Sequence, residues 1–134
     1  MPCDFQTFAV DLYEERKANG DEATIRTCIS RLYYSIYHAV LRWLQTNNAD
    51  LRAKFKCGSH ERIQFSLQAI ARETKKIQFN ELALKLHNLH ARRCTADYKL
   101  DQKQVSQHVE LMVKDVARAH FLFNELVAFM KNKP

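Results

Sequence analysis

Two short stretches of the sequence hold the residue types that could do chemistry. The first is SRLYYSIYHA, from Ser30 to Ala39, in which Arg31 and His38 have six residues between them. Positions seven apart on a helix differ by only about 20° around its axis, so both side chains would project from one face. They would lie roughly 10 Å apart along that axis. This spacing suits an extended substrate, such as an RNA backbone, with the imidazole available for proton transfer.

The second stretch is RCTADY, from Arg93 to Tyr98. Apolar positions earlier in the same segment project onto Arg93, so this arginine is expected to face inward and to need a partner. Asp97 lies one helical turn further on, on the same face. A structural ion pair that fixes this segment to the Ser30–Ala39 segment is the simpler interpretation, and a catalytic role for Arg93 is the alternative.

Metal-ligand residue types occur, but their spacing is not that of a known site. They are Cys57, His60, His87, His90 and Cys94, and paired ligands in zinc sites come at set spacings that are absent here. The two glycines stand alone, so there is no phosphate-binding loop. No metal and no cofactor is predicted. Tyr33, Tyr37 and Trp43 have helical spacing and are expected in the core or an interface.

The elements that must position these residues are expected to be helices. The chain has 134 residues with only two Gly and two Pro, too few turn residues for a β-rich domain. One domain spanning 1–134 is predicted, an all-α, up-and-down bundle of four to five helices. A capping box of Asp101 and Gln104 is expected to start the last helix. The expected helices cover about 4–18, 21–45, 59–73, the stretch from 77 to 98, and 101 to the C-terminus, with 46–58 a polar connection.

The net charge of +6 favours a polyanionic partner. Solvated helix ends explain the same excess equally well. No apolar run approaches the ~20 residues that span a bilayer, and the N-terminus lacks the pattern of a secretory signal. A cytoplasmic protein with reduced cysteines is therefore expected. The candidate RNA-contacting residues are Arg52, Lys54, Lys56, Arg62 and Arg92.

The blocks Ser-Arg-x-Tyr-Tyr-x-x-x-His-Ala and Arg-x-x-Ala-Asp-Tyr, about 55 residues apart, resemble those of the HEPN superfamily, in particular its small stand-alone bacterial and archaeal members. The resemblance covers most of the chain. It implies a dimerising helical bundle, and many relatives are metal-independent endoribonucleases that serve as toxins or in phage defence, often beside a nucleotidyltransferase partner. By this resemblance, Arg31 and His38 are the candidate catalytic pair, with a polar centre of Tyr34, Arg93, Asp97 and Tyr98.

One departure from the family pattern leaves the function open. Active relatives carry an Arg followed, after four to six residues, by a His near the start of a late helix. Here Ala-Asp-Tyr follows Arg93 instead, and only Arg31 with His38 has the required spacing. An endoribonuclease is therefore one hypothesis, a non-catalytic module that binds RNA, a nucleotide or a protein partner is the second, and a homodimeric structural protein without a ligand is the third.

Overall fold

The computed structural model describes residues 22–53 and 58–132. Four helices lie in this part of the chain, α2 (Glu22–Ala53), α3 (Ser59–Thr74), α4 (Gln78–Tyr98) and α5 (Ser106–Lys131). No strand occurs among these residues. The all-α prediction is confirmed, while the helix expected at 4–18 lies outside the described residues.

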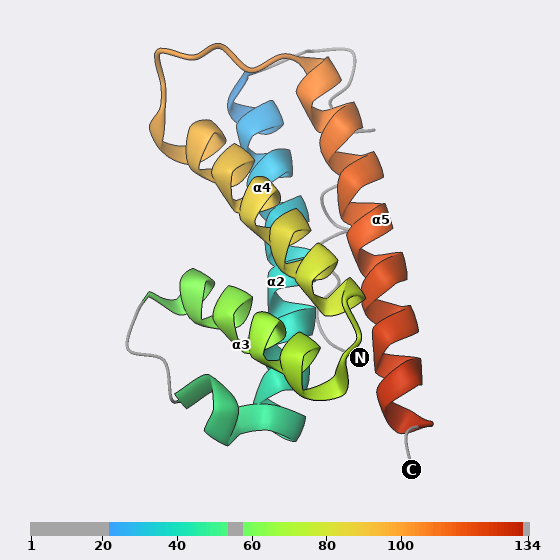
Figure 1. The fold of residues 1–134 in the computed structure, drawn as a ribbon. Helices are drawn as coiled ribbons and strands as arrows, with labels where there is room; N and C mark the ends of the chain where they lie inside the picture. The colour runs from blue at the N-terminus through green and yellow to red at the C-terminus, as the bar shows by residue number, and fades with distance from the viewer. Residues whose placement is uncertain (1–21, 54–57, 133–134) are drawn as a thin grey trace.

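Helix α2, like α4, packs against all three of the other described helices (Figure 1). It contacts α3, α4 and α5, while α3 and α5 each also pack on α4. The apolar side chains of α2 recur every three or four residues, so one stripe of the helix is removed from water between Ile25 and Leu44. The fully buried positions of this stripe include Leu32, Ile36, Val40 and Leu44. Tyr33 and Tyr37 are buried as predicted, with exposures of 2% and 8%.

Helices α3 and α4 form a hairpin around a turn of three residues. Lys75 ends α3 in the left-handed conformation, with φ of 59°. The hydroxyl oxygen of Thr74 accepts the backbone N–H of Lys76, at 3.2 Å. Left-handed residues commonly close helices in this way because the chain reverses there. The predicted bounds of both helices agree with the structure to within one residue.

Two predicted boundaries are wrong. Helix α2 continues to Ala53, so the segment from 46 onward is largely helical and not a loop. Polar residues such as those at 46–53 are compatible with a helix whose outer faces are solvated, and composition alone could not distinguish the two. The side chain of Arg52 and all of Lys54 and Lys56 lie outside the described residues.

The second wrong boundary is the start of α5. The helix begins at Ser106, five residues after Asp101, so the capping box of Asp101 and Gln104 does not form. Instead, the N–H of Val105 donates to Nδ1 of His108, and the N–H of His108 donates to the carbonyl oxygen of Val105, each at 2.9 Å. We call residues 99–105 the α4–α5 connection. It crosses the first turns of α2 (Figure 1). Within the described ranges, no helix is long and apolar enough to cross a membrane.

Candidate functional site

The two sequence blocks meet where α4 crosses α2. Nε of Arg93 lies 2.8 Å from Oδ2 of Asp97, one turn along α4, and the hydroxyl of Ser30 on α2 donates to the same carboxylate oxygen at 3.2 Å. The Arg93 side chain is only 13% exposed. The contact is an ion pair by distance, although its direction is not that of an aligned hydrogen bond. Asp97 therefore neutralises Arg93 and also links α4 to α2.

Two aromatic rings surround the same guanidinium. The Arg93 carbon Cζ lies 5.1 Å from the ring centre of Tyr34 on α2 and 5.2 Å from that of Tyr98 on α4. A guanidinium at this range is attracted to the negative face of an aromatic ring. Arg93 also donates to the hydroxyl oxygen of Tyr98 at 3.3 Å. We call Ser30, Tyr34, Arg93, Asp97 and Tyr98 the arginine–tyrosine site.

Arg31 and His38 lie on α2 beside this site, and both are exposed. The imidazole of His38 stacks on the ring of Tyr34, with 5.6 Å between ring centres and 26° between planes. Burial, and then the nearby charge of Arg42, lower the pKa of His38 below its ordinary value. The imidazole is therefore neutral at pH 7 and has the protonation state of a general base.

A cavity of about 540 Å³ opens between α2 and the end of α4. Its lining includes Ser30, Arg31, Tyr34 and Asp97, so it joins the arginine–tyrosine site to the exposed arginine. Leu100, 73% exposed, stands at its edge.

The remaining candidate RNA-contacting residues are scattered. Arg92 points away from the arginine–tyrosine site and pairs with Asp115 on α5, at 2.6 Å. Arg62 on α3 is half-buried, and its Nε makes no hydrogen bond to the described residues. Of the five candidates, the two whose side chains the structure describes, Arg62 and Arg92, thus lie on different helices.

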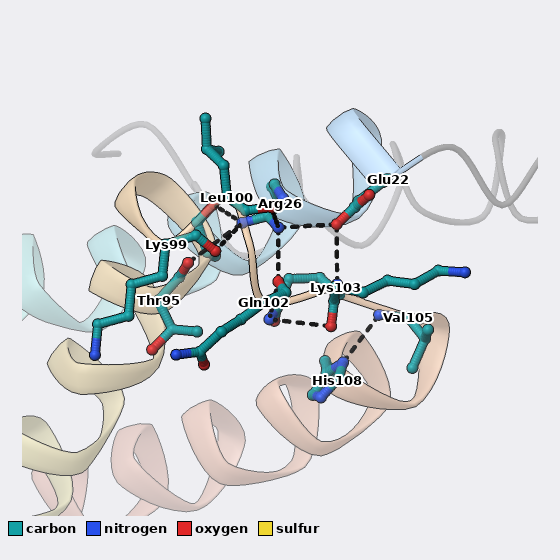
Figure 2. Close-up of polar contacts among 11 residues, drawn as sticks. Glu22, Arg26, Thr95, Lys99, Leu100, Gln102, Lys103, Val105 and His108 are labelled. Carbon is teal, nitrogen blue, oxygen red and sulfur yellow. Dashed lines mark hydrogen bonds and ion pairs between the residues drawn. The ribbon is translucent and has the colours of Figure 1, made fainter.

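Arg26 is a residue that sequence reasoning missed. Its two terminal nitrogens donate to the carbonyl oxygens of Ala96, at 2.8 Å, and Gln102, at 2.7 Å (Figure 2). The carboxylate of Glu22 accepts from Arg26 at 2.8 Å and from the backbone N–H of Gln104 at 3.1 Å. The hydrogen bond from Gln104, followed by that from Arg26, lowers the pKa of Glu22. We call Glu22 and Arg26 the α2 clamp, because they hold the end of α4 and the α4–α5 connection.

A second missed feature is a histidine pair between α3 and α4. The rings of His60 and His90 stack with 4.1 Å between centres and 24° between planes. The hydroxyl of Tyr33 on α2 is hydrogen-bonded to Nδ1 of His60 at 2.6 Å, and Sγ of Cys94 lies 3.5 Å from Nε2 of His90. The sequence had identified His60, His90 and Cys94 only as residue types that could bind a metal, and Tyr33 as a core or interface residue. Among the described residues, no three side chains gather as metal ligands.

The coupling between Arg93 and Asp97 can be measured by a double-mutant cycle. Arg93→Met and Asp97→Asn should show a coupling energy of about 1 kcal/mol in chemical denaturation, because the pair is close and partly shielded from water. The control cycle is Arg118→Met with Asp115→Asn, whose charged atoms are 3.6 Å apart with 70% of the arginine side chain exposed. Equal coupling energies in the two cycles would contradict the structural role of the Arg93–Asp97 pair.

No family model matches the chain, and neither a curated protein nor a solved structure matches it. What this site does must therefore be inferred from the chemistry of its own residues.

Proposed function

We propose that the chain is a HEPN-type domain that binds single-stranded RNA across α2 and α4 and cleaves it without a metal ion. The supporting observation is Tyr98, a member of the arginine–tyrosine site that is 68% exposed and follows the cavity-lining Asp97 in the chain. The two HEPN-like blocks contribute Tyr34 and Arg93, which lie in contact. The resemblance supplies the substrate class.

In the bound state, one base would stack on the ring of Tyr98, and one backbone phosphate would pair with the guanidinium of Arg31. Arg93 lies near the rings of both Tyr34 and Tyr98, but Tyr34 also stacks with His38 and is half-buried. Tyr98 is the more open aromatic ring, and an unpaired base can stack on such a ring whatever its sequence. Arg31 lines the adjoining cavity and would neutralise a backbone phosphate there.

Cleavage would proceed through the ribose 2′-hydroxyl. His38, neutral at pH 7, would accept the hydroxyl proton while the 2′-oxygen attacks phosphorus. The bond from phosphorus to the 5′-oxygen would break, and that oxygen would take a proton from solvent or from the His38 imidazolium formed in the first transfer. The products would be a 2′,3′-cyclic phosphate and a 5′-hydroxyl. Arg31 would offset the charge that develops on the phosphate oxygens.

A non-catalytic HEPN module is the second candidate, and one observation favours it. By the resemblance, active relatives carry their arginine about where Arg92 and Arg93 lie in this sequence, yet Asp97 and two tyrosine rings already engage the Arg93 guanidinium. A cation held in this way stabilises the packing of α4 on α2. Such a module would bind RNA or a partner of the nucleotidyltransferase type, as a homodimer, without cutting.

Binding is tested with a fluorescently labelled oligouridine. Tyr98→Ala should weaken binding by about tenfold, since the loss of one base-stacking ring is worth 1–3 kcal/mol. Tyr98→Phe keeps the ring and should bind as the wild type does. Phe121→Ala is a matched control, because Phe121 is an equally exposed ring, 67%, on α5. Fluorescence anisotropy measures all four proteins, and equal losses for Tyr98→Ala and Phe121→Ala would contradict the binding face.

Cleavage is tested by incubating the full chain with total RNA in EDTA. The wild type should produce fragments with cyclic phosphate ends, whereas the double variant Arg31→Ala/His38→Ala should leave RNA intact. Lys114→Ala, which removes an exposed cation from α5, serves as the charge control. Intact RNA with the wild type, alongside normal oligouridine binding, would refute the cleavage step and support the non-catalytic module.

A further inference from the structure

A second cavity, of about 290 Å³, lies between α4, α5 and the α4–α5 connection. It shares no lining residue with the arginine–tyrosine site. Its floor is apolar, formed by Ile29 and Met112, whose exposures are 2% and 0%. Leu111, 54% exposed, extends the apolar surface to the rim. The cavity can therefore hold a small apolar body.

The walls of this cavity carry positive charge and no acidic side chain. Arg92 comes from α4, Lys103 from the connection and His108 from α5, so three elements each contribute a donor side chain to the lining. Nδ1 of His108 accepts the N–H of Val105, which places the hydrogen of the neutral ring on Nε2. His108 thus presents an N–H donor even when it is uncharged.

The wall formed by the connection is held in place by the α2 clamp. Arg26 donates to the carbonyl oxygen of Gln102, and Glu22 accepts the N–H of Gln104, and both glutamines line the cavity (Figure 2). Because these contacts fix the backbone before any ligand arrives, little conformational entropy would be lost on binding.

We propose that this cavity binds a small organic phosphate monoester. The apolar body would rest on Ile29 and Met112, and the phosphate would face Arg92, Lys103 and His108. A phosphate presents three oxygens in different directions, which suits donors from three elements better than the two coplanar oxygens of a carboxylate do. This inference is independent of the proposed RNA binding.

One carboxylate would compete with the ligand. Asp115 lies outside the lining, but its Oδ2 is 2.6 Å from Arg92. Removing that carboxylate would leave Arg92 available to the phosphate. Asp115→Asn should therefore bind the ligand more tightly than the wild type, which is the opposite of what a merely destabilising substitution would do.

Isothermal titration calorimetry of the full chain with phenyl phosphate tests the inference. Lys103→Gln should weaken binding by about tenfold or more, because it removes one charge-assisted hydrogen bond. Lys99→Gln is the matched control, since Lys99 is an exposed lysine of the same connection that does not line the cavity. Leu111→Asp would place a negative charge at the rim and should abolish binding, whereas Leu111→Asn should retain it.

A comparison of ligands tests the role of the apolar floor and the preference for phosphate separately. Inorganic phosphate, benzoate and benzyl alcohol should each bind more weakly than phenyl phosphate. Equal affinity for inorganic phosphate would refute the role of the apolar floor, and equal affinity for benzoate would refute the preference for phosphate. Equal losses with Lys103→Gln and Lys99→Gln, or no heat with phenyl phosphate at millimolar concentration, would overturn the site altogether. Thermal melts of each variant separate lost binding from lost folding.

Discussion

Arg26→Ala is expected to destabilise the protein by about 3 kcal/mol, because hydrogen bonds from a charged donor contribute 1.5–3 kcal/mol each and are not additive. The side chain is 12% exposed and donates at short range to the carbonyl oxygens of Ala96 and Gln102. Longer contacts, of 3.3 to 3.5 Å, reach Thr95, Lys99 and Leu100. Removing one side chain would thus leave several carbonyl groups at the end of α4 without their donor.

Chemical denaturation measures this loss, and the melting temperature should fall by roughly 10 °C. Arg26→Lys keeps the charge but lacks the forked donor geometry. Its stability should therefore lie between that of the wild type and that of Arg26→Ala. Arg42→Ala removes an exposed arginine from the same helix and should change stability by less than about 0.5 kcal/mol. Comparable losses for Arg26→Ala and Arg42→Ala would show that the α2 clamp does not stabilise the fold.

Acidification from pH 6.5 to about 4 is expected to destabilise the protein through the stacked histidines. Burial, then the neighbouring His90 and Arg93, lower the pKa of His60 to about 4. Burial and the charge of Arg93 also lower the pKa of His90. Both groups bind protons more readily in the unfolded chain, so their contribution is complete above the unfolded pKa of about 6.5 and is lost as the pH falls toward 4.

The groups around His60 and His90 explain why the pKa values of both histidines are lowered. Tyr33 and Tyr37 pack on His60 from α2, and Arg93 and His87 add positive charge from α4. Among the described groups, Glu61 on α3 has the opposite effect and raises the pKa of His90. The pair is partly exposed, so solvent screening reduces the loss to the order of 1–2 kcal/mol. Unfolding free energies measured at pH 7, 6, 5 and 4.5 test this expectation.

A variant carrying His60→Gln and His90→Gln should lose most of this pH dependence. His87→Gln, which removes an exposed histidine one turn from His90, should keep most of it. Carboxylates such as Glu22, whose pKa is lowered from the ordinary 4.5, lose their contribution from about that pH downward, so the histidine effect is compared between pH 6.5 and 5. A double variant as sensitive as the wild type between pH 6.5 and 5 would refute the role of the stack.

Much of the helical framework could be predicted from the sequence. The spacing of Ile25, Ile29, Leu32 and Ile36 places one stripe of α2 in the core, and all four are buried. Helices α3 and α4 follow from the same periodicity, with the break at Lys75 and Lys76 between them. The expectation that Arg93 faces inward with Asp97 beside it rested on the same reasoning, and the structure places both side chains against α2.

The α2 clamp could not be predicted, because most of its acceptors are backbone carbonyls. Every residue carries such a group, so no side-chain pattern marks the ones that Arg26 reaches. Only the four-residue spacing of Glu22 and Arg26 was visible, and it is common on exposed helices. The stacking of His60 on His90 depends on how α3 aligns with α4, and that alignment is set by tertiary packing. The start of α5 was misplaced because the N–H of Gln104 is bonded to Glu22, far away in sequence.

The long sequence separation of the α2 clamp has a consequence for the order of folding. The α3–α4 hairpin closes around three residues, whereas Arg26 bonds to partners 70 and 76 positions away. Short loops close at low entropic cost, so the hairpin is expected to form early and the clamp late. Contacts that form after the transition state leave the folding rate nearly unchanged and slow unfolding. Arg26 would therefore set how long a folded molecule survives more than how quickly it is made.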